Sequence, residues 1–274
     1  MTYPVPLVTT DWLSRHLADD RVRVLDASWY LPSAGRNPAE EYAAGHIPGA
    51  IFCDLDAISE QETSLPHMLP SAGQFARDAG SLGVSDTTHV VVYDASGFNM
   101  SAARVWWMFR AFGHESVAVL DGGLGKWRSE GRALEPGVVT PRRSRFRPRA
   151  NSGMVRSREE MKENVATARE QVLDARSRGR FEGTEPEPRP GLRRGHIPGS
   201  RNLPFAALVQ PDGTLLPAPD LRARFEESGL KLDKPVVTTC GSGTTACALL
   251  LGLHVLGATS IALYDGSWSE WGAE

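Results

Sequence analysis

The chain has 274 residues, of which 41% are hydrophobic and 23% charged, and its formal net charge is -3. These values argue against a disordered chain and against a globally basic nucleic-acid binder. Three cysteines are too few for a secreted protein stabilised by disulfides, so we expect a cytoplasmic protein. The length indicates two domains or one large domain. The N-terminal residues lack the apolar run of an export signal, and the most apolar stretch, 246–258, is too short to cross a membrane.

The chain contains one internal repeat. Four blocks recur in the same order, each 144 to 150 residues later: VLDA at 24–27 and 172–175, GHIPGA at 45–50 and GHIPGS at 195–200, VVVYDASG at 90–97 and VVTTCGSG at 236–243, and VLDGG at 119–123 and LYDGS at 263–267. Nearly constant spacing indicates two copies of one domain. We place the first domain at residues 1–134 and the second at 153–274.

Within each copy, short β-branched runs alternate with helix-like stretches. In chain order we predict a strand at 22–25, a helix at 74–82, a strand at 90–93, a helix at 101–112, strands at 117–120 and 172–173, a helix at 221–228, a strand at 236–239, a helix at 245–256 and a strand at 261–264. Strands separated by helices form parallel βαβ units. The expected fold is therefore α/β, with a mainly parallel sheet flanked by helices in each half.

The segment between the two copies, 135–152, is expected to be a linker. Its part from 141 onward reads PRRSRFRPRANSG and has no helical or strand period, which is typical of exposed chain. Five arginines lie there: Arg142, Arg143, Arg145, Arg147 and Arg149. A nucleic-acid site is one interpretation, but charge runs in a weakly acidic chain are usually solvated or clamp two domains together, so we expect no nucleic-acid partner.

The turn that follows the strand at 236–239 is the best candidate for chemistry, because ligands of parallel sheets bind beyond the carboxyl ends of the strands. It reads Cys240-Gly241-Ser242-Gly243-Thr244-Thr245. Its glycines allow successive N–H groups to curl around an anion, and the following helix presents its positive end, so a thiolate at Cys240 is stabilised. We therefore expect Cys240 to be a nucleophile, whereas Cys53 and Cys247 are expected to be packing residues.

The first copy provides an internal comparison. Its residue equivalent to Cys240 is Asp94, in Asp94-Ala95-Ser96-Gly97. A carboxylate is not a sulfur nucleophile, so the first domain is expected to be catalytically silent and to form a wall of the site.

Two chemistries suit a cysteine in such a loop. A cysteine phosphatase needs an arginine six positions after the cysteine to clamp phosphate, and that position is Ala246. Sulfur transfer needs a thiolate that takes a sulfur atom from a donor, holds it as a persulfide anion among backbone amides, and passes it to an acceptor. The neutral loop favours sulfur transfer.

The paired GHIPG blocks, the cysteine loop and the closing YDGSWSEW resemble the tandem-domain rhodanese sulfurtransferases, and CGSGTTA resembles the loop of the 3-mercaptopyruvate sulfurtransferases. The likeness covers essentially the whole chain. In thiosulfate-using rhodaneses this loop carries basic side chains, whereas Gly241, Ser242 and Gly243 are small and neutral. The resemblance therefore implies 3-mercaptopyruvate as the sulfur donor.

The resemblance also implies roles for individual residues. Cys240 matches the persulfide-forming nucleophile, with Gly241, Gly243, Thr244 and Thr245 around the substrate. Arg180 and Arg189, in the segment GRFEGTEPEPR, match the arginines that hold the carboxylate and keto oxygens of the substrate. Arginine suits this task because its planar fork binds a carboxylate with two hydrogen bonds.

Ser242, His67 and Asp56 match a Ser-His-Asp proton relay proposed for the family. Loss of sulfur from mercaptopyruvate leaves an enolate that must gain a proton, and a hydroxyl backed by His and carboxylate can supply it. His67 and Asp56 belong to the first copy, so the site is expected at the interface of the two halves. Thr244 departs from the Val usual in the family, and its hydroxyl is expected to affect donor or acceptor preference.

The expected function is transfer of sulfur from 3-mercaptopyruvate, through a Cys240 persulfide, to a thiol such as thioredoxin or a small dithiol, or to cyanide in vitro, with release of pyruvate. No metal or organic cofactor and no membrane partner are expected. Two alternatives stay open: a thiosulfate:cyanide sulfurtransferase on the same scaffold, and a non-catalytic rhodanese-like sensor or binding module, against which the presence of Cys240 argues.

Overall fold

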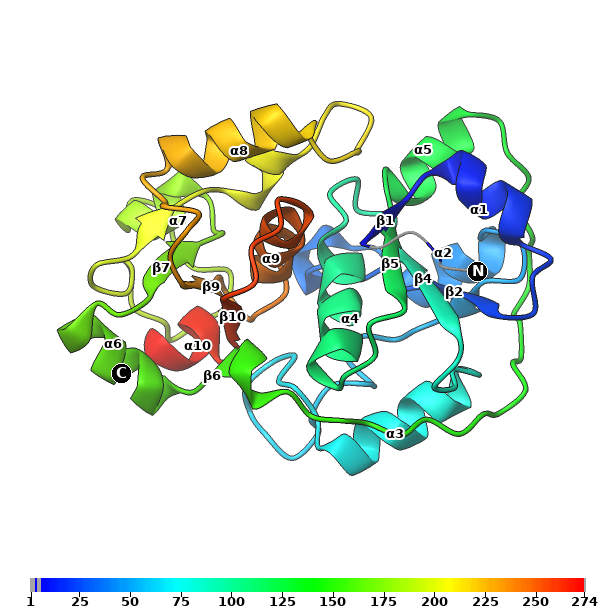
Figure 1. Cartoon of the computed structure of the whole chain (residues 1–274), viewed down its shortest axis with the longest axis horizontal. Coiled ribbons are helices and arrows are strands. Elements are labelled where there is room, and N and C mark those ends of the chain that lie inside the picture. Colours follow the sequence, from blue (N-terminus) through cyan, green and yellow to red (C-terminus); the bar gives the residue numbers. More distant parts are fainter. Residues whose placement is uncertain (1–2, 4–5, 274) are drawn as a thin grey trace.

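The computed structural model describes residue 3 and residues 6–273, and within them the chain forms two five-stranded sheets with helices on both faces (Figure 1). The strand orders are β1-β5-β4-β2-β3 and β6-β10-β9-β7-β8, and all the neighbouring strands are parallel. The second order repeats the first, strand for strand. The predicted α/β fold with two similar halves is confirmed.

The first half contains strands of two to five residues and helices of seven to twelve: β1 Leu7–Val8, α1 Thr10–His16, β2 Val22–Asp26, α2 Pro38–Ala44, β3 Ile51–Phe52, α3 Ala72–Ser81, β4 His89–Tyr93, α4 Met100–Ala111, β5 Val117–Leu120 and α5 Gly123–Ser129. The predicted strands and helices of this half agree with β2, α3, β4, α4 and β5 to within two residues at each end. β4 lies in the middle of the sheet and is buried along its whole length.

The second half repeats this plan: β6 Val155–Arg156, α6 Arg158–Thr167, β7 Gln171–Asp174, α7 Arg178–Glu182, β8 Arg201–Asn202, α8 Ala218–Glu227, β9 Val236–Thr239, α9 Ala246–Val255, β10 Ile261–Tyr264 and α10 Ser267–Trp271. None of the helices described has the length and the apolar character that crossing a bilayer requires. β9 is the central strand, and the predicted cysteine loop begins where it ends.

The two halves share one hydrophobic core, which is built around the packing of α4 against α9 in the centre of the molecule (Figure 1). α9 is apolar on all sides and nearly every residue of it is buried, as expected for a helix enclosed between two domains. Trp106 of α4 lies against His254 of α9, with ring centroids 5.5 Å apart. Both helices follow the central strand of their sheet, so this packing brings the two strand-to-helix turns to one interface.

The segment between the domains runs along α3 (Figure 1). Its arginines are exposed, as the sequence predicts, but Phe146 is buried. The ring of Phe146 contacts those of Phe75 and Phe109 edge to face, with centroids 5.6 and 6.0 Å away. The backbone N–H of Ser144 donates to the carbonyl of Gly80 at 2.8 Å. One aromatic side chain therefore fixes this otherwise irregular segment to the first domain.

A turn of the second half also contacts the first. Val209 and Leu215 form an antiparallel bridge, and the turn between them reaches α5 and the loops beside it. Lys126 donates to Asp212 at 2.8 Å, and the N–H of Leu215 donates to Asp121 at 2.8 Å. These contacts fix the orientation of the two halves and thereby the shape of the site between them.

Candidate active site

Cys240 lies immediately after β9 and is almost fully buried, with 1% of its surface exposed. It lines a cavity of about 440 Å³ that both halves of the chain enclose. From the second half come the cysteine loop, Arg176, Arg180 and Arg189. From the first half come mainly aromatic and apolar side chains: Trp29, Tyr30, Leu31, Phe98 and Met100. The second half therefore contributes three arginines to the cavity, whereas the first half contributes mostly apolar side chains together with Arg36.

The cysteine loop is held open by glycine and by α10. Gly243 has a φ of +77°, and a Cβ there would lie 3.0 Å from both Nη1 of Arg104 and the carbonyl of Asp265. The N–H groups of Trp268 and Ser269 donate to the carbonyls of Cys240 and Gly241 at 2.9 and 2.8 Å. Within the described residues, the N–H groups of 241–245 have no hydrogen-bond acceptor in the protein. They form a ready cradle for an anion on the sulfur of Cys240.

The first copy fills the equivalent position with its own carboxylate. One oxygen of Asp94 accepts from the N–H and hydroxyl groups of Ser96, and the other accepts from Ser101 and from the N–H of Ala102 at the start of α4. Asp94 therefore occupies the anion site that Cys240 leaves available in the second copy.

Arg180 and Arg189, which the family resemblance singles out, both line the cavity beside Cys240. A Cβ at Gly241 would lie 2.9 Å from Nη2 of Arg180 and 3.8 Å from Nη1 of Arg189. Arg189 makes no hydrogen bond or salt bridge among the described residues. Burial lowers the pKa of Arg189 from its usual value, while the nearby Cys240 opposes this shift and Arg180 adds to it. The two guanidinium groups can receive a small carboxylate next to the sulfur.

Ser242, His67 and Asp56 form a continuous chain of hydrogen bonds across the domain interface. Nδ1 of His67 lies 3.0 Å from Oγ of Ser242, and Nε2 lies 3.1 Å from Oδ1 of Asp56. Trp29 donates to the other oxygen of Asp56 at 3.0 Å. His67 has a φ of +60°, and Arg104 donates to its carbonyl, so its backbone is fixed in this unusual conformation.

Burial and hydrogen bonding define the charge states of this chain of residues. Burial lowers the pKa of His67 below 6.5, although its hydrogen bond to Asp56 acts in the opposite direction. The same hydrogen bond is the main reason that the pKa of Asp56 lies below its usual value. At neutral pH, therefore, Asp56 is ionised and His67 is neutral. Its Nε2–H donates to Asp56 and its Nδ1 accepts from Ser242.

Thr244 is the second hydroxyl at His67. Its Oγ1 lies 3.1 Å from Nδ1 of His67, and its side chain is buried. Since a neutral imidazole nitrogen has one lone pair, Thr244 and Ser242 compete for the same acceptor. Of the other loop residues, Gly241 and Thr245 line the cavity, whereas Gly243 faces Arg104 and Asp265 instead.

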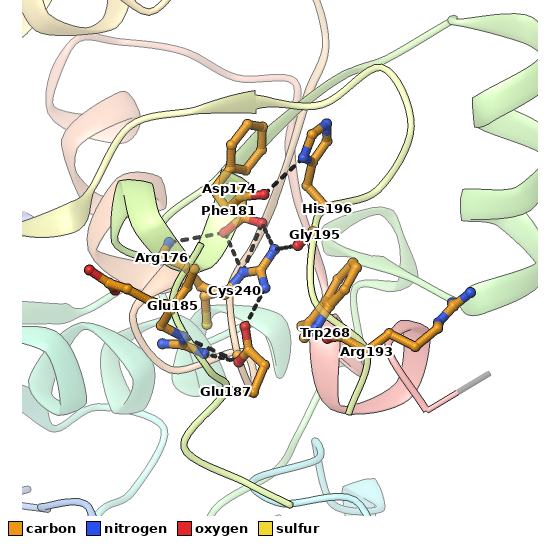
Figure 2. Close-up of polar contacts among 12 residues, drawn as sticks. Asp174, Arg176, Phe181, Glu185, Glu187, Arg193, Gly195, His196, Cys240 and Trp268 are labelled. Atoms are coloured by element: carbon orange, nitrogen blue, oxygen red, sulfur yellow. Dashed lines mark hydrogen bonds and ion pairs between the residues drawn. The ribbon is translucent and has the colours of Figure 1, made fainter. Parts of the chain in front are cut away.

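Two buried charged residues that were not predicted from the sequence, Arg176 and Glu187, lie beside the cavity (Figure 2). A signal for Arg176 exists in the repeat, because the VLDA blocks align it with Ser28 of the silent copy. Glu187 lies between the two predicted arginines in the sequence TEPEPR. No pattern distinguishes its carboxylate from that of Glu185, which pairs with the exposed Ser177.

The fold and the site together define a tandem α/β protein in which a buried cysteine, Cys240, lines a cavity between the two halves. The chain belongs to the rhodanese family: the model of the Rhodanese-like domain matches residues 9–130 and again 157–274. The family resemblance inferred from the sequence is confirmed.

Within this family the chain is similar to sulfurtransferases along nearly its whole length. It is 46% identical to the human protein named 3-mercaptopyruvate sulfurtransferase, with 97% of this chain and 91% of the relative covered. It is 45% identical to the Arabidopsis thaliana protein named thiosulfate/3-mercaptopyruvate sulfurtransferase 1, mitochondrial, over 98% of this chain and 76% of that one.

A solved structure shows the same arrangement of domains. The crystal structure of SseA from Escherichia coli, described among the 3-mercaptopyruvate sulfotransferases, superposes with a TM-score of 0.88 at 40% identity. The match covers 96% of this chain and 98% of SseA.

Proposed function

We propose that this protein is a 3-mercaptopyruvate sulfurtransferase that works through a persulfide on Cys240. The thiolate of Cys240 attacks the sulfur of mercaptopyruvate. A sulfur–sulfur bond forms and the carbon–sulfur bond breaks, so that its electron pair leaves with the carbon as the enolate of pyruvate. The enolate carbon gains a proton to give pyruvate, and the persulfide anion lies in the cradle of amides from 241–245.

The observation that carries this proposal is the position of two arginines beside a nucleophilic cysteine in one cavity. Arg180 and Arg189 bind the carboxylate and keto oxygens of the donor and thereby hold its sulfur against Cys240. The positive charges also stabilise the enolate oxygen as it forms. We assign Gly241, Thr244 and Thr245 to the wall that surrounds the donor.

Ser242, His67 and Asp56 carry the proton. Neutral His67 accepts the proton of the donor's thiol through the hydroxyl of Ser242, and Asp56 stabilises the imidazolium that results. The same proton then returns through Ser242 to the enolate carbon, so the cycle needs no external acid. The geometry of 3.0 and 3.1 Å supports this relay.

We assign the second sulfur transfer to a thiol acceptor, such as thioredoxin or a small dithiol, with cyanide as a substitute in vitro. The acceptor thiolate attacks the outer sulfur of the persulfide and regenerates Cys240. The three cysteines of the chain are free and buried, in keeping with a reducing compartment such as the cytoplasm. The Arabidopsis relative, in contrast, is named as mitochondrial.

We place the end of the first domain at residue 134, the linker at 135–152 and the start of the catalytic domain at residue 153. The first domain contributes no nucleophile. In the first copy, the hydrogen-bonded carboxylate of Asp94 stands where the second copy has Cys240. The first domain nevertheless supplies His67 and Asp56, which explains its presence in the active molecule.

Thiosulfate:cyanide sulfur transfer is the second candidate, since the name of the Arabidopsis relative includes thiosulfate. The uncharged cysteine loop disfavours it, because a small dianion would have no basic side chain within residues 240–245.

Intact mass spectrometry tests the proposal. Incubation with 3-mercaptopyruvate without acceptor is expected to add one sulfur atom to the protein, and Cys240→Ser is expected to prevent the gain. Cys247→Ser is the matched control and should retain the gain. Unlike Cys240, Cys247 does not line the cavity, its Sγ donates to the carbonyl of Gly243, and burial raises its pKa to about 12. If wild-type protein gains no sulfur from any donor, a non-catalytic binding role is the better explanation.

A further inference from the structure

Arg176 is the most extensively bonded side chain near the cavity, and it is fully buried (Figure 2). Its Nε donates to both oxygens of Asp174 at 3.1 and 3.0 Å, and Nη2 donates to Oδ2 of Asp174 at 2.7 Å and to the carbonyl of Gly195 at 2.8 Å. The ring of Trp268 lies against its guanidinium at 4.3 Å. Nη1 is then the group that reaches toward the cavity, and it donates to Glu187 at 2.7 Å.

Glu187 joins Arg176 to Arg180. Its side chain is 2% exposed, its Oε1 accepts from Arg176, and its Oε2 accepts from Nη2 and Nε of Arg180 at 2.5 and 3.2 Å. Because two nitrogens of the Arg180 guanidinium donate to the same oxygen of Glu187, both the position and the plane of the guanidinium are fixed. Because Arg176 itself is held by Asp174 on the end of β7, this orientation derives from the sheet.

The charges of this cluster balance. Asp174 and Glu187 offset Arg176 and Arg180, so four buried or half-buried charges have no net charge. Arg189 carries the remaining positive charge, and burial, together with the charge of Arg180, lowers its pKa. Glu187 places a negative charge beside Arg180 and thereby offsets the repulsion between Arg180 and Arg189.

The repeat shows that this cluster belongs to the second copy. Asp26 is equivalent to Asp174, but the position of Arg176 is occupied by Ser28, whose N–H donates to Asp26 at 2.9 Å. The fold therefore does not require the arginine at this strand end. The buried arginine accompanies the cysteine, which ties it to the chemistry of the site.

We infer that Glu187, held by Arg176, is a positioning residue that fixes Arg180 for the recognition of a carboxylate next to Cys240. This inference rests on the proposed function, since it takes Cys240 as the nucleophile and Arg180 as a donor-binding group. Glu187 does not touch the donor. It acts through Arg180 alone.

Alkylation of Cys240 by two matched reagents tests this inference without turnover. Iodoacetate carries a carboxylate and iodoacetamide does not, so the ratio of their rates reports how well the arginines hold a carboxylate at the sulfur. Glu187→Gln is expected to lower this ratio about tenfold, as loss of a charge-assisted hydrogen bond to Arg180 implies. Glu187→Asp keeps the charge but withdraws the carboxylate, and it should lower the ratio as well.

Glu185→Gln is the matched control, because Glu185 lies two residues away in the same segment and bonds Ser177 rather than Arg180. It should leave the ratio within about twofold of wild type. An unchanged ratio of the two alkylation rates in Glu187→Asp would overturn the inference. A higher ratio in Glu187→Gln would also overturn it, because Glu187 would then only offset the positive charge of the arginines. Because alkylation uses no sulfur donor, a failure of the proposed sulfur transfer appears only in the mass-gain experiment, and the two outcomes remain distinguishable.

Discussion

Among single residues, the proposed reaction depends on which hydroxyl group donates a hydrogen bond to His67. Nδ1 of His67 lies at almost the same distance from Ser242 and Thr244, 3.0 and 3.1 Å. Both side chains also line the cavity, and the family resemblance assigns the relay to Ser242. The hydroxyl of Thr244 therefore reduces the share of the time in which Ser242 is bonded to His67.

We predict that Thr244→Val keeps or raises kcat for 3-mercaptopyruvate, by up to about twofold, because Ser242 becomes the single hydroxyl at Nδ1. Ser242→Ala should lower kcat by about a hundredfold or more, the usual contribution of a positioned acid-base group. Steady-state pyruvate release with a dithiol acceptor measures both variants. A larger loss in Thr244→Val than in Ser242→Ala would assign the relay to the wrong hydroxyl.

The pH dependence follows from the lowered pKa of His67. Neutral His67 accepts from Ser242 and protonated His67 does not, so the relay is intact above its folded-state pKa and is lost as the pH falls through that value, which lies below 6.5. Because Asp56 raises the pKa of His67, Asp56→Asn should move the acid limb of kcat to lower pH while it lowers the plateau. A pH–rate profile of both proteins from pH 4.5 to 8, with intervals of about half a unit, makes the comparison. An acid limb that moves to higher pH in Asp56→Asn would contradict the assigned protonation states.

The lowered pKa of His67 also predicts that the folded protein is less stable at low pH. The folded state holds His67 neutral at pH values where the unfolded chain is protonated, so its contribution to stability is complete above about pH 6.5 and declines below it.

At the scale of elements, the cysteine loop depends on a backbone that only glycine adopts at low cost. Gly243 combines a φ of +77° with close neighbours on two sides, whereas Gly257 has a φ of +83° and no atom within 4 Å of the place that a Cβ would take. The two glycines share their backbone conformation and differ in their surroundings.

We predict that Gly257→Ala costs about 1 kcal/mol of stability and leaves activity unchanged, because the cost is that of the left-handed conformation alone. Gly243→Ala should in addition displace the loop from Arg104 and Asp265 and lower kcat/KM more than about tenfold. Urea unfolding and pyruvate release on the two variants test this. Equal activity in both would show that the loop tolerates displacement.

How far the sequence predicts the elements depends on their length and periodicity. The helices α4 and α9 have twelve and ten residues, and the central strands β4 and β9 contain β-branched runs, so the sequence predicts all four elements well. The edge strands β1 and β6 have two residues each, and α7 and α10 have five, so their patterns are too short to detect. The segment around Phe146 has no helical or strand periodicity, so the sequence does not predict that Phe146 is buried. The structure shows that its ring packs against Phe75.

The same limit applies to the site. The Gly-Ser-Gly turn predicts the position of Cys240 because a local pattern dictates local backbone geometry. The approach of His67 to Ser242 spans 175 residues and came from resemblance alone. The bridge from Arg176 through Glu187 to Arg180 depends on side-chain directions in an irregular loop, which neither spacing nor composition encodes.

At the scale of the whole molecule, a buried ion pair joins the two halves. Nη1 of Arg104 in the first half donates to Oδ1 of Asp265 in the second at 2.7 Å, and the side chains are 0% and 4% exposed. Asp265 also accepts from the N–H of Leu69 at 2.7 Å. Since Arg104 bonds the carbonyl of His67 as well, the same pair aligns the relay with the cysteine loop.

We predict that Asp265→Asn lowers the free energy of unfolding by about 3–5 kcal/mol, because it leaves the charge of Arg104 buried without a partner. Asp212→Asn is the matched control. It removes one of the two acidic partners of Lys126, the one in the second half, and leaves Glu130 in place. Because this contact between the halves is partly exposed, the loss should cost about 1 kcal/mol or less. Urea unfolding measures both. Equal costs would show that the buried pair is not what couples the halves.

We propose that this molecule takes sulfur from 3-mercaptopyruvate at Cys240. A comparison of kcat/KM for two sulfur donors tests this proposal most directly. Pyruvate and sulfide release from 3-mercaptopyruvate with a dithiol is measured beside sulfur transfer from thiosulfate to cyanide, with Cys240→Ser as the blank. We expect a large preference for 3-mercaptopyruvate, because Arg180 and Arg189 recognise its carboxylate and the loop offers no basic side chain to thiosulfate. A preference for thiosulfate would contradict it and would remove the roles assigned to both arginines.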